Sequence, residues 1–217
     1  MSAKYYVMLM DVIGSSDLPN RDEVTEKLEK AMASVNATCK DDFLAPFEIT
    51  RGDEVAAVLT SIANTYDIIT IFRETLFPVG MRTTLIYDEL ISGLGSRQSS
   101  IIDGPAFHRG NSQMLNLKKT QKTFGLNTGQ PELDQGAAAL LNLLLWQWNN
   151  FTPLQQNIIR LYQEIKHQGK VAKIIRRTQQ QVQFTLEKCR WELIDEAEKT
   201  IRRMLLNIDK KAKIEGL

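Results

Sequence analysis

The sequence contains only two cysteines and two histidines among its 217 residues. Cys39 and Cys189 stand far apart and form no CxxC pair, which excludes a disulfide framework and a Cys/His zinc site. The longest apolar run, 137–145, is interrupted by Asn142 and is too short for a membrane helix of roughly 20 residues. The first residues, 1–12, lack the apolar core and cleavage site of a signal peptide, so we expect a cytoplasmic protein without a membrane contact.

Several catalytic motifs are also missing. The chain has no GxSxG, no P-loop and no GxGxxG, and its two histidines argue against hydrolysis by a Ser/His/Asp triad. The composition is 43% hydrophobic and 24% charged with a mean hydropathy of -0.25. These values are typical of a globular protein with an ordinary core.

The net charge of +1 hides an asymmetry along the chain. Residues 1–144 hold 13 Lys/Arg against 18 Asp/Glu, whereas residues 145–217 hold 14 against 8. The two parts therefore carry charges of -5 and +6. Gly, Pro and Asp concentrate before Gly136, and Gln, Leu, Lys and Arg in helical spacing follow it, so we expect two domains.

The first part of the chain alternates between strand and helix patterns. A near-continuous apolar run suits a central strand, and Arg51, Gly52 and Asp53 separate two short β-like runs as a tight hairpin turn. This order, βαββαβ, predicts an antiparallel sheet backed by two helices, the ferredoxin-like arrangement, with the first strand beside the hairpin. The expected elements are strand 5–12, helix 23–39, strands 47–50 and 55–59, helix 62–76 and strand 81–87.

The expected topology brings two carboxylates together at one end of the sheet. Asp11 ends the first strand and Asp53 lies in the neighbouring hairpin, so the pair is a candidate Mg²⁺ site that also holds nucleotide phosphates. A simpler interpretation stays open, in which Asp11 is a cap or turn residue. Glu54 is then a solvent-facing hairpin residue rather than a general base.

Three short motifs carry a resemblance to known families. Residues 11–15, DVIGS, resemble the metal-binding first strand of class III nucleotide cyclases. Residues 51–55, RGDEV, resemble their second metal motif and the GGDEF turn of diguanylate cyclases. Residues 103–108, DGPAFH, resemble the glycine-led helix start that follows the fourth cyclase strand. In this order the motifs are most similar to the SatD family of bacterial proteins, over about residues 4–120.

The resemblance implies a cyclase-like palm domain that binds a nucleotide together with Mg²⁺. It implies Asp11 and Asp53 as metal ligands. The nucleotide contacts that it implies are Gly14, Ser15, Arg51 and Gly52. The candidates for a catalytic role are Glu54, His108 and Arg109, the last as a replacement for a missing cyclase arginine.

Three positions depart from the cyclase pattern. The substrate-reading Lys of cyclases corresponds to Ile49, and their transition-state Asn and Arg correspond to His108 and Ser112. Losing these groups raises the barrier of phosphoryl transfer, where a protein contributes mainly positioning and charge neutralisation. Asp103 and His108 also have structural interpretations, as the N-cap of the following helix and as a satisfied histidine.

The last third of the chain is a series of helical patterns. The first is apolar nearly all round, which predicts a helix buried between the domains or in a dimer contact. The expected elements are a helix over 137–148, a helix from Thr152 to Gly169, a short segment over 170–176 and a long helix from Gln179 toward Leu206. Three helices with a short middle one predict a helix-turn-helix. The charged tail, 209–217, is expected to fray.

Three positions in this part resemble the helix-turn-helix of sigma-factor region four and of LuxR-type regulators. Ala172, Thr178 and Val182 hold the places of the small packing residue, the cap of the recognition helix and its first core residue. Arg176 stands where Gly is usual, and a left-handed backbone there costs on the order of 1 kcal/mol. Gln pairs with adenine, and Lys and Arg neutralise phosphates. The candidate DNA contacts are Lys170, Lys173, Arg176, Arg177, Thr178, Gln179, Gln180, Gln181 and Gln183.

Two functions follow from these patterns. The first is a cytoplasmic DNA-binding regulator of the SatD type, a homodimer whose degenerate cyclase-like domain senses a nucleotide or serves as a scaffold. The second is an active Mg²⁺-dependent nucleotidyl cyclase or polymerase. For the C-terminal part, a helical bundle that makes protein contacts is the alternative to DNA binding. The expected domains are 1–130, α+β and cyclase-like, a connecting helix over 131–150, and the all-α helix-turn-helix domain over 151–217.

Overall fold

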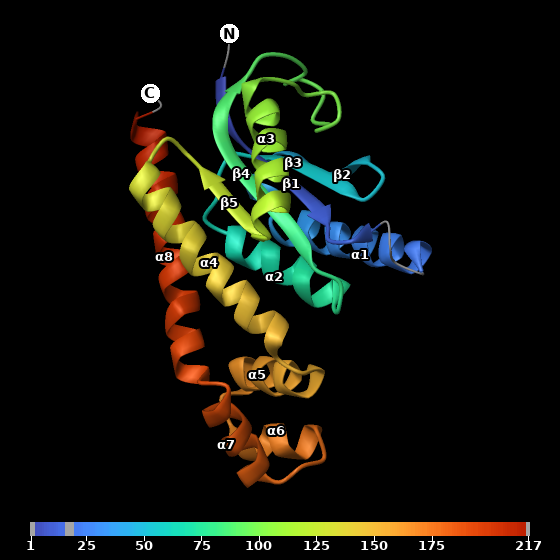
Figure 1. Cartoon of the computed structure of the whole chain (residues 1–217), viewed down its shortest axis with the longest axis vertical. Coiled ribbons are helices and arrows are strands. Elements are labelled where there is room, and N and C mark those ends of the chain that lie inside the picture. The colour runs from blue at the N-terminus through green and yellow to red at the C-terminus, as the bar shows by residue number, and fades with distance from the viewer. Residues whose placement is uncertain (1–2, 16–19, 216–217) are drawn as a thin grey trace. The chain divides into compact units, whose positions relative to one another are not determined.

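The computed structural model describes residues 3–15 and 20–215, which form a mixed α+β chain (Figure 1). The sheet unit comprises the residues up to Asn142 and those from Ile201 onward, and the helical unit comprises Leu143–Thr200. The elements are β1 (Ala3–Val12), α1 (Arg21–Thr38), the 3-10 helix η2 (Lys40–Asp42), β2 (Phe43–Arg51), β3 (Glu54–Leu59), α2 (Thr65–Leu76), β4 (Met81–Leu90), α3 (Pro105–Thr120), β5 (Phe124–Asn127), α4 (Pro131–Asn150), α5 (Pro153–Ile165), α6 (Gln168–Ile174), α7 (Gln179–Lys188) and α8 (Trp191–Glu215).

Five strands form one sheet in the order β2-β3-β1-β4-β5. β1 pairs antiparallel with β3 and with β4, and β2 and β3 form the hairpin. The register places Asp11 opposite Glu54, the residue after Asp53. β5 runs parallel to β4 and extends the sheet beyond the strands expected from the sequence. Its pattern was missed because four residues are too few for a clear alternation.

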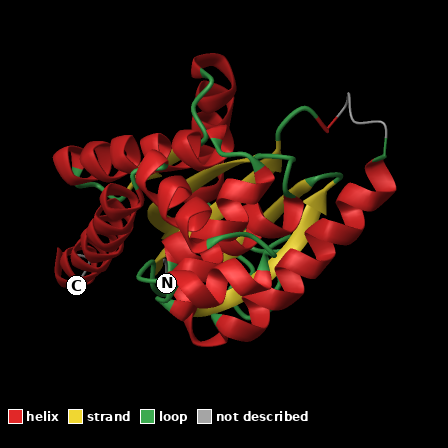
Figure 2. Ribbon diagram, turned by 90° about the horizontal axis from the view of Figure 1, so that it is seen from below, coloured by secondary structure: helices red, strands yellow, loops and turns green. Residues whose placement is uncertain are grey.

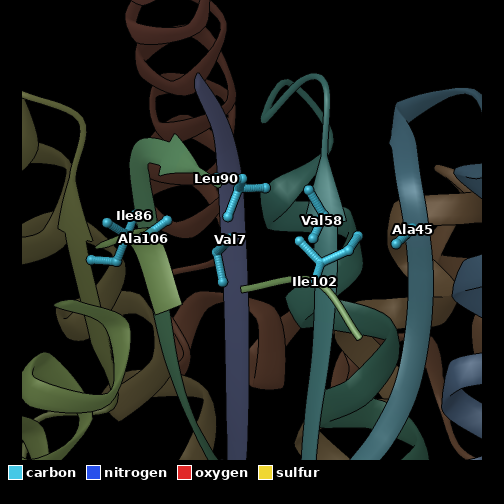
Figure 3. Close-up of a cluster of buried hydrophobic side chains, with 7 residues drawn as sticks. All are labelled: Val7, Ala45, Val58, Ile86, Leu90, Ile102 and Ala106. Atoms are coloured by element: carbon cyan, nitrogen blue, oxygen red, sulfur yellow. The ribbon is translucent and has the colours of Figure 1, made fainter. Parts of the chain in front are cut away.

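Helices cover both faces of the sheet (Figures 1 and 2). Because side chains alternate along a strand, Val7 faces α3 while its neighbours Tyr6 and Met8 are buried on the opposite face. Helix α3 packs on β1, β4 and β5, and α1 and α2 pack against each other. Figure 3 shows the apolar cluster on the α3 face, which joins four strands to the start of α3. It comprises Val7, Ala45, Val58, Ile86, Leu90, Ile102 and Ala106.

The C-terminal end of α8 is an integral part of the sheet unit. The helix continues to Glu215, so the expectation of a frayed tail from residue 209 is wrong for the described residues. Residues 216 and 217 lie outside the described part of the chain. The expected domain boundaries lie at 130 and 150, whereas the units divide within α4, between Asn142 and Leu143, and again within α8, between Thr200 and Ile201. The side chains buried in this last part of α8 are Ile201, Leu205, Ile208 and Ala212.

A buried carboxylate fastens this end of α8. Asp209 is almost fully buried, and its carboxylate accepts hydrogen bonds from the Ser61 hydroxyl at 2.9 Å and from the Ile62 amide at 3.4 Å. The Lys213 ammonium lies 2.8 Å from the same carboxylate. Burial, together with the Asp209 charge, raises the pKa of Tyr6 far above its usual range. Asp209, which the sequence placed in a charged tail, is therefore a buried and hydrogen-bonded residue of the sheet unit.

Helix α4 is tied to β5 by the polar residue that interrupts its apolar run. The Asn142 side chain accepts from the amides of Thr123 and Phe124 at 2.9 and 3.0 Å and donates to the Phe124 carbonyl at 2.8 Å. Leu143 and Trp146 are both 61% exposed, so the helix is not buried all round as its composition suggested. Among residues 3–15 and 20–215, the helices are all too short or too polar to span a bilayer.

The helical unit contains α5, α6 and α7, which pack on one another (Figure 1). Their shared core is apolar and is formed by Ile158, Ile159, Val171, Ala172, Val182 and Leu186. The expectation of a single long helix from Gln179 toward Leu206 is wrong, because the helix is interrupted between the end of α7 and the start of α8. Arg190 takes a left-handed backbone there with φ 52, and neither Gly nor Pro announces this break in the sequence.

Candidate functional site

A groove of about 700 Å³ opens on the face of the sheet that carries α3. Its lining comes from β1, β3, the end of β2, the loop before α3 and α3 itself, and we call it the α3 groove. The volume falls within the range of about 300 to 1,000 Å³ that is typical of small-molecule sites. The charged and titratable residues that line it are Arg51, Glu54, Asp103, His108 and Lys118.

Asp11 lies beside the groove and is only 5% exposed. Its Oδ2 is 3.0 Å from the Lys118 ammonium on α3 and 4.0 Å from the Arg82 guanidinium on β4. Lys118 was not among the candidates from the sequence. The helical spacing of Asn111, Leu115 and Lys118 places all three on the wall of the groove, and this pattern is the signal that was missed.

The β2-β3 hairpin supplies the second carboxylate of the expected pair. Glu54 lines the groove opposite Asp11 in the strand register. Asp53 sits in the turn, and its buried Oδ2 has no hydrogen-bond partner among the described residues. Gly52 has φ 59, a left-handed conformation that glycine adopts without strain, and exposed Arg51 lines the groove.

The two carboxylates expected to hold Mg²⁺, Asp11 and Asp53, differ in whether a partner is already present, because Asp53 Oδ2 has none among the described residues. The Asp11 carboxylate is already neutralised by Lys118. No three His, Cys, Asp or Glu side chains are grouped to hold a metal within residues 3–15 and 20–215. Gly14 and Ser15, the expected phosphate contacts after β1, are not among the described residues that line the groove. Among the described residues, the two cationic side chains that line the groove are Lys118 and Arg51.

The start of α3 lies at the other end of the groove. Gly104, not Asp103, holds the N-cap position, so the expected capping role of Asp103 is corrected. The Asp103 carboxylate accepts from the Gly104 amide at 2.8 Å and lies 3.7 Å from His108 Nε2. A side chain at position 104 would meet the Glu89 carbonyl at 2.7 Å, which explains the glycine. The Ser112 hydroxyl donates back to the His108 carbonyl at 3.0 Å.

Arg109 forms an ion pair with Asp88 and not with Asp11. Its Nε is 3.0 Å from the Asp88 carboxylate on β4. Asp88 pairs in register with Tyr5, at the start of β1, whereas Asp11 is near the end of that strand. The two positions are about 20 Å apart at the usual rise of a β-strand. Arg109 therefore lies at the opposite end of β1 from the carboxylate that a catalytic arginine would serve.

Glu48 on β2 fastens the loop that closes one side of the groove. Its Oε1 accepts from the Ser99 hydroxyl at 3.0 Å and from the Ser100 amide. The same hydroxyl lies 3.0 Å from the Ala56 carbonyl. Burial raises the pKa of Glu48, but the donors from Ser100 and Ser99 outweigh it and hold the pKa below its usual range. The loop is thereby held against the hairpin.

The second candidate site is on the helical unit. Arg176 has φ 54, the left-handed backbone expected from the missing glycine, and the Arg177 amide donates to the Ala172 carbonyl at 2.9 Å. Thr178 caps α7 as expected. Its hydroxyl accepts from the Gln181 amide at 3.2 Å, and the Gln181 side chain accepts from the Thr178 amide at 3.1 Å. This reciprocal capping box fixes the start of α7.

The solvent-facing side of α7, the α7 face, differs from the expected row of reading glutamines. The side-chain oxygen of Gln181 already accepts from the Thr178 backbone amide in the capping box. The side-chain amide of Gln183 donates to the Glu187 carboxylate at 2.9 Å. Gln180 makes no side-chain hydrogen bond within the described part of the chain. The exposed residues of the α7 face are Gln179, Gln180, Gln181, Gln183, Phe184, Glu187 and Lys188.

Replacing Gln181 should weaken the fold of the helical unit. We expect Gln181→Ala to lower the free energy of unfolding by about 0.5 to 2 kcal/mol, because it removes half of the capping box. Gln180→Ala, one residue away on the same helix, should change it by less than about 0.5 kcal/mol. Urea unfolding followed by tryptophan fluorescence measures both, and equal effects of the two changes would contradict the capping assignment.

The comparisons with known proteins come from a family model and from solved structures. The SatD family model matches residues 5–188, most of the chain. This chain belongs to the SatD family. The matched range runs from β1 to the last residue of α7 and so includes the groove and the α7 face of this SatD protein. The search of the curated proteins found no match.

Solved structures similar to this SatD protein include two structures of a bacterial light-regulated adenylyl cyclase. One is 15% identical with a TM-score of 0.41, covering 58% of this chain and 76% of that chain. The other is 14% identical with a TM-score of 0.42, covering 58% and 43%. The guanylyl cyclase Cya2 is 14% identical with a TM-score of 0.40, covering 52% and 69%. At these values the similarity assigns no activity to the SatD chain.

Proposed function

We propose that this SatD protein is a DNA-binding regulator whose α7 enters the major groove. The observation that carries the proposal is the capped, solvent-facing α7 directly preceded by a cluster of exposed cations. In this orientation the N-terminal residues of α7 reach base edges, and the cations of α6 and the following turn contact phosphates. The cluster consists of Lys170, Lys173, Arg176 and Arg177.

Charge supports DNA rather than a protein partner for this surface. Residues 151–190, which span α5 to α7, contain eight Lys/Arg and only two Asp/Glu. The first turns of α8, residues 191–200, contain four Asp/Glu against one Lys. The positive charge is therefore concentrated on the helices that carry the α7 face. Phosphate neutralisation by such cations supplies the sequence-independent part of DNA affinity.

The protein would act as a homodimer on a two-part site. Two copies of α7 related by a twofold axis read half-sites whose centres lie about 10 base pairs apart. A symmetric DNA sequence with this spacing is therefore the expected target. A single copy would instead select an unrepeated sequence.

Selection from a library of random duplexes tests this proposal. The whole protein should enrich a symmetric motif, and Gln180→Ala should change the enriched bases at one position of each half-site. Gln180 is chosen because its amide is free to pair with adenine N6 and N7, whereas Gln181 is held in the cap. An enriched motif that is unchanged in Gln180→Ala would reject α7 as the reading helix, and no enrichment by the wild type would reject sequence-specific binding.

A second function is favoured by the α3 groove. We propose that it binds a nucleotide or another phosphorylated ligand, without turnover, as the sensory site of the regulator. Lys118 and Arg51 offer charge to phosphates, and Phe107 and Leu115 offer apolar surface to a base. The positions that depart from the cyclase pattern, including Ile49 and Ser112, argue against catalysis.

Titration calorimetry with ATP and GTP, with and without Mg²⁺, tests the groove. We expect binding that persists without Mg²⁺ and is weakened at least about tenfold in Lys118→Ala, since a charge-assisted contact to phosphate is lost. Lys119→Ala is the matched control, because Lys119 is exposed and does not line the groove. Formation of a cyclic or linear nucleotide product would contradict the absence of turnover, and equal loss in both variants would contradict the site.

A further inference from the structure

The α7 face carries one large apolar side chain. Phe184 is 65% exposed. It follows Gln180 by one helical turn, so the two side chains project from the same side of α7. Neither side chain is held by a hydrogen bond within the described residues, whereas Gln181 and Gln183 are both engaged. Gln180 and Phe184 therefore present an amide and a phenyl ring, one helical turn apart, on the same side of α7.

The floor of the major groove offers one partner for each of these groups. Adenine presents N6 and N7 to a glutamine amide, and thymine presents the C5 methyl group, which makes apolar contacts with side chains such as phenylalanine. The four residues from Gln180 to Phe184 rise about 6 Å along the helix. Base pairs follow one another at about 3.4 Å, so the two side chains reach positions about two steps apart.

We propose that Phe184 is a specificity-determining residue that contacts a thymine methyl group about two base pairs from an adenine contacted by Gln180. This inference rests on the DNA binding proposed above, and it specifies two bases of the DNA half-site, a thymine and an adenine. A second copy of this chain fits the ring less well. The α7 face itself holds one acid, Glu187, and one base, Lys188. The segment that carries it, residues 151–190, has eight Lys/Arg against two Asp/Glu and a net charge of +6, so two copies of this part of the chain repel each other.

The test uses the duplex that the whole protein enriches from a random library. Each thymine is replaced in turn by uracil, which removes only the methyl group. Affinity is measured by fluorescence anisotropy for the wild type, Phe184→Ala and Gln180→Ala. We expect one replacement per half-site to weaken wild-type binding about fourfold, the value of one buried methyl group. That effect should vanish in Phe184→Ala and persist in Gln180→Ala.

The outcomes separate this inference from the proposed function. An enriched duplex that tolerates uracil at every position, or a uracil effect that survives in Phe184→Ala, overturns the role of Phe184 and leaves DNA binding intact. No enriched duplex and no binding overturn both proposals together. Sedimentation of the same variants completes the test, since loss of self-association in Phe184→Ala with an unchanged uracil effect would assign the ring to a protein contact. Thermal unfolding shows whether Phe184→Ala keeps the wild-type fold, as its exposure predicts.

Discussion

A chain with Leu205→Ala and Ile208→Ala should lose most of the stability of its sheet unit. Both side chains are fully buried, and each Leu or Ile to Ala change in a core costs about 2 to 5 kcal/mol. Together they remove about 4 to 10 kcal/mol, which is comparable with the whole stability of a typical domain. Leu206→Ala, whose side chain is 39% exposed on the same helix, should change the free energy of unfolding far less.

Amide hydrogen exchange along β1 measures this loss in the sheet unit itself. The double variant should exchange the β1 amides at nearly unprotected rates, whereas Leu206→Ala should protect them like the wild type. Tryptophan fluorescence reports on the helical unit, because that unit contains all three tryptophans, Trp146, Trp148 and Trp191. It is therefore the control that separates unfolding of the sheet unit from unfolding of the helical unit. Protection of β1 that is equal in the double variant and in Leu206→Ala would show that the end of α8 does not contribute to the sheet unit.

Removing two cations of α6 should lower the salt dependence of DNA binding. Each phosphate contact contributes about 0.9 to the slope of log affinity against log salt, so Lys170→Ala with Lys173→Ala should lower the slope by about two. At about 150 mM salt the same loss weakens binding on the order of 30-fold. Anisotropy of a labelled mixed-sequence duplex over a range of salt concentrations gives both values.

The control for this prediction changes net charge equally at other places in the helical unit. Arg160 lies 3.8 Å from Glu164, and Lys199 is paired with Asp195, so both cations already have acidic partners in the protein. Arg160→Ala with Lys199→Ala should leave the slope within about half a unit of the wild type. If both double variants lower the slope alike, the charge acts through the field of the whole unit rather than through contacts from α6.

Local patterns in the sequence predicted the parts of the site that depend on local structure. The hairpin around Gly52 was predicted by its turn residues, and the cap of α7 by Thr178, because both depend on a few neighbouring residues. The backbone of Arg176 followed from the same kind of reasoning. The register of β1 and β3 then brought Asp11 opposite the hairpin, at Glu54.

The remaining features depend on contacts between distant parts of the chain. The sequence suggests that Asp209 belongs to a charged tail. Only the fold shows that its carboxylate accepts a hydrogen bond from the Ser61 hydroxyl, 148 residues earlier in the chain. Lys118 reads as a solvated residue near a helix end, yet it neutralises Asp11. Gln181 reads as one of several equivalent glutamines until its place in the capping box is known. Patterns of single residues do not carry this information, because each depends on a partner placed by the fold.

The most direct test of the central claim is a map of the surface that duplex DNA protects. Hydrogen exchange of the whole protein is compared with and without a mixed-sequence duplex at low salt, where phosphate contacts are strongest. We predict slower exchange over residues 168–188, which comprise α6, the turn and α7, and no change along β1. Protection confined to the sheet unit, or exchange that DNA leaves unchanged throughout the chain, would contradict the assignment of α7 as the DNA-binding helix.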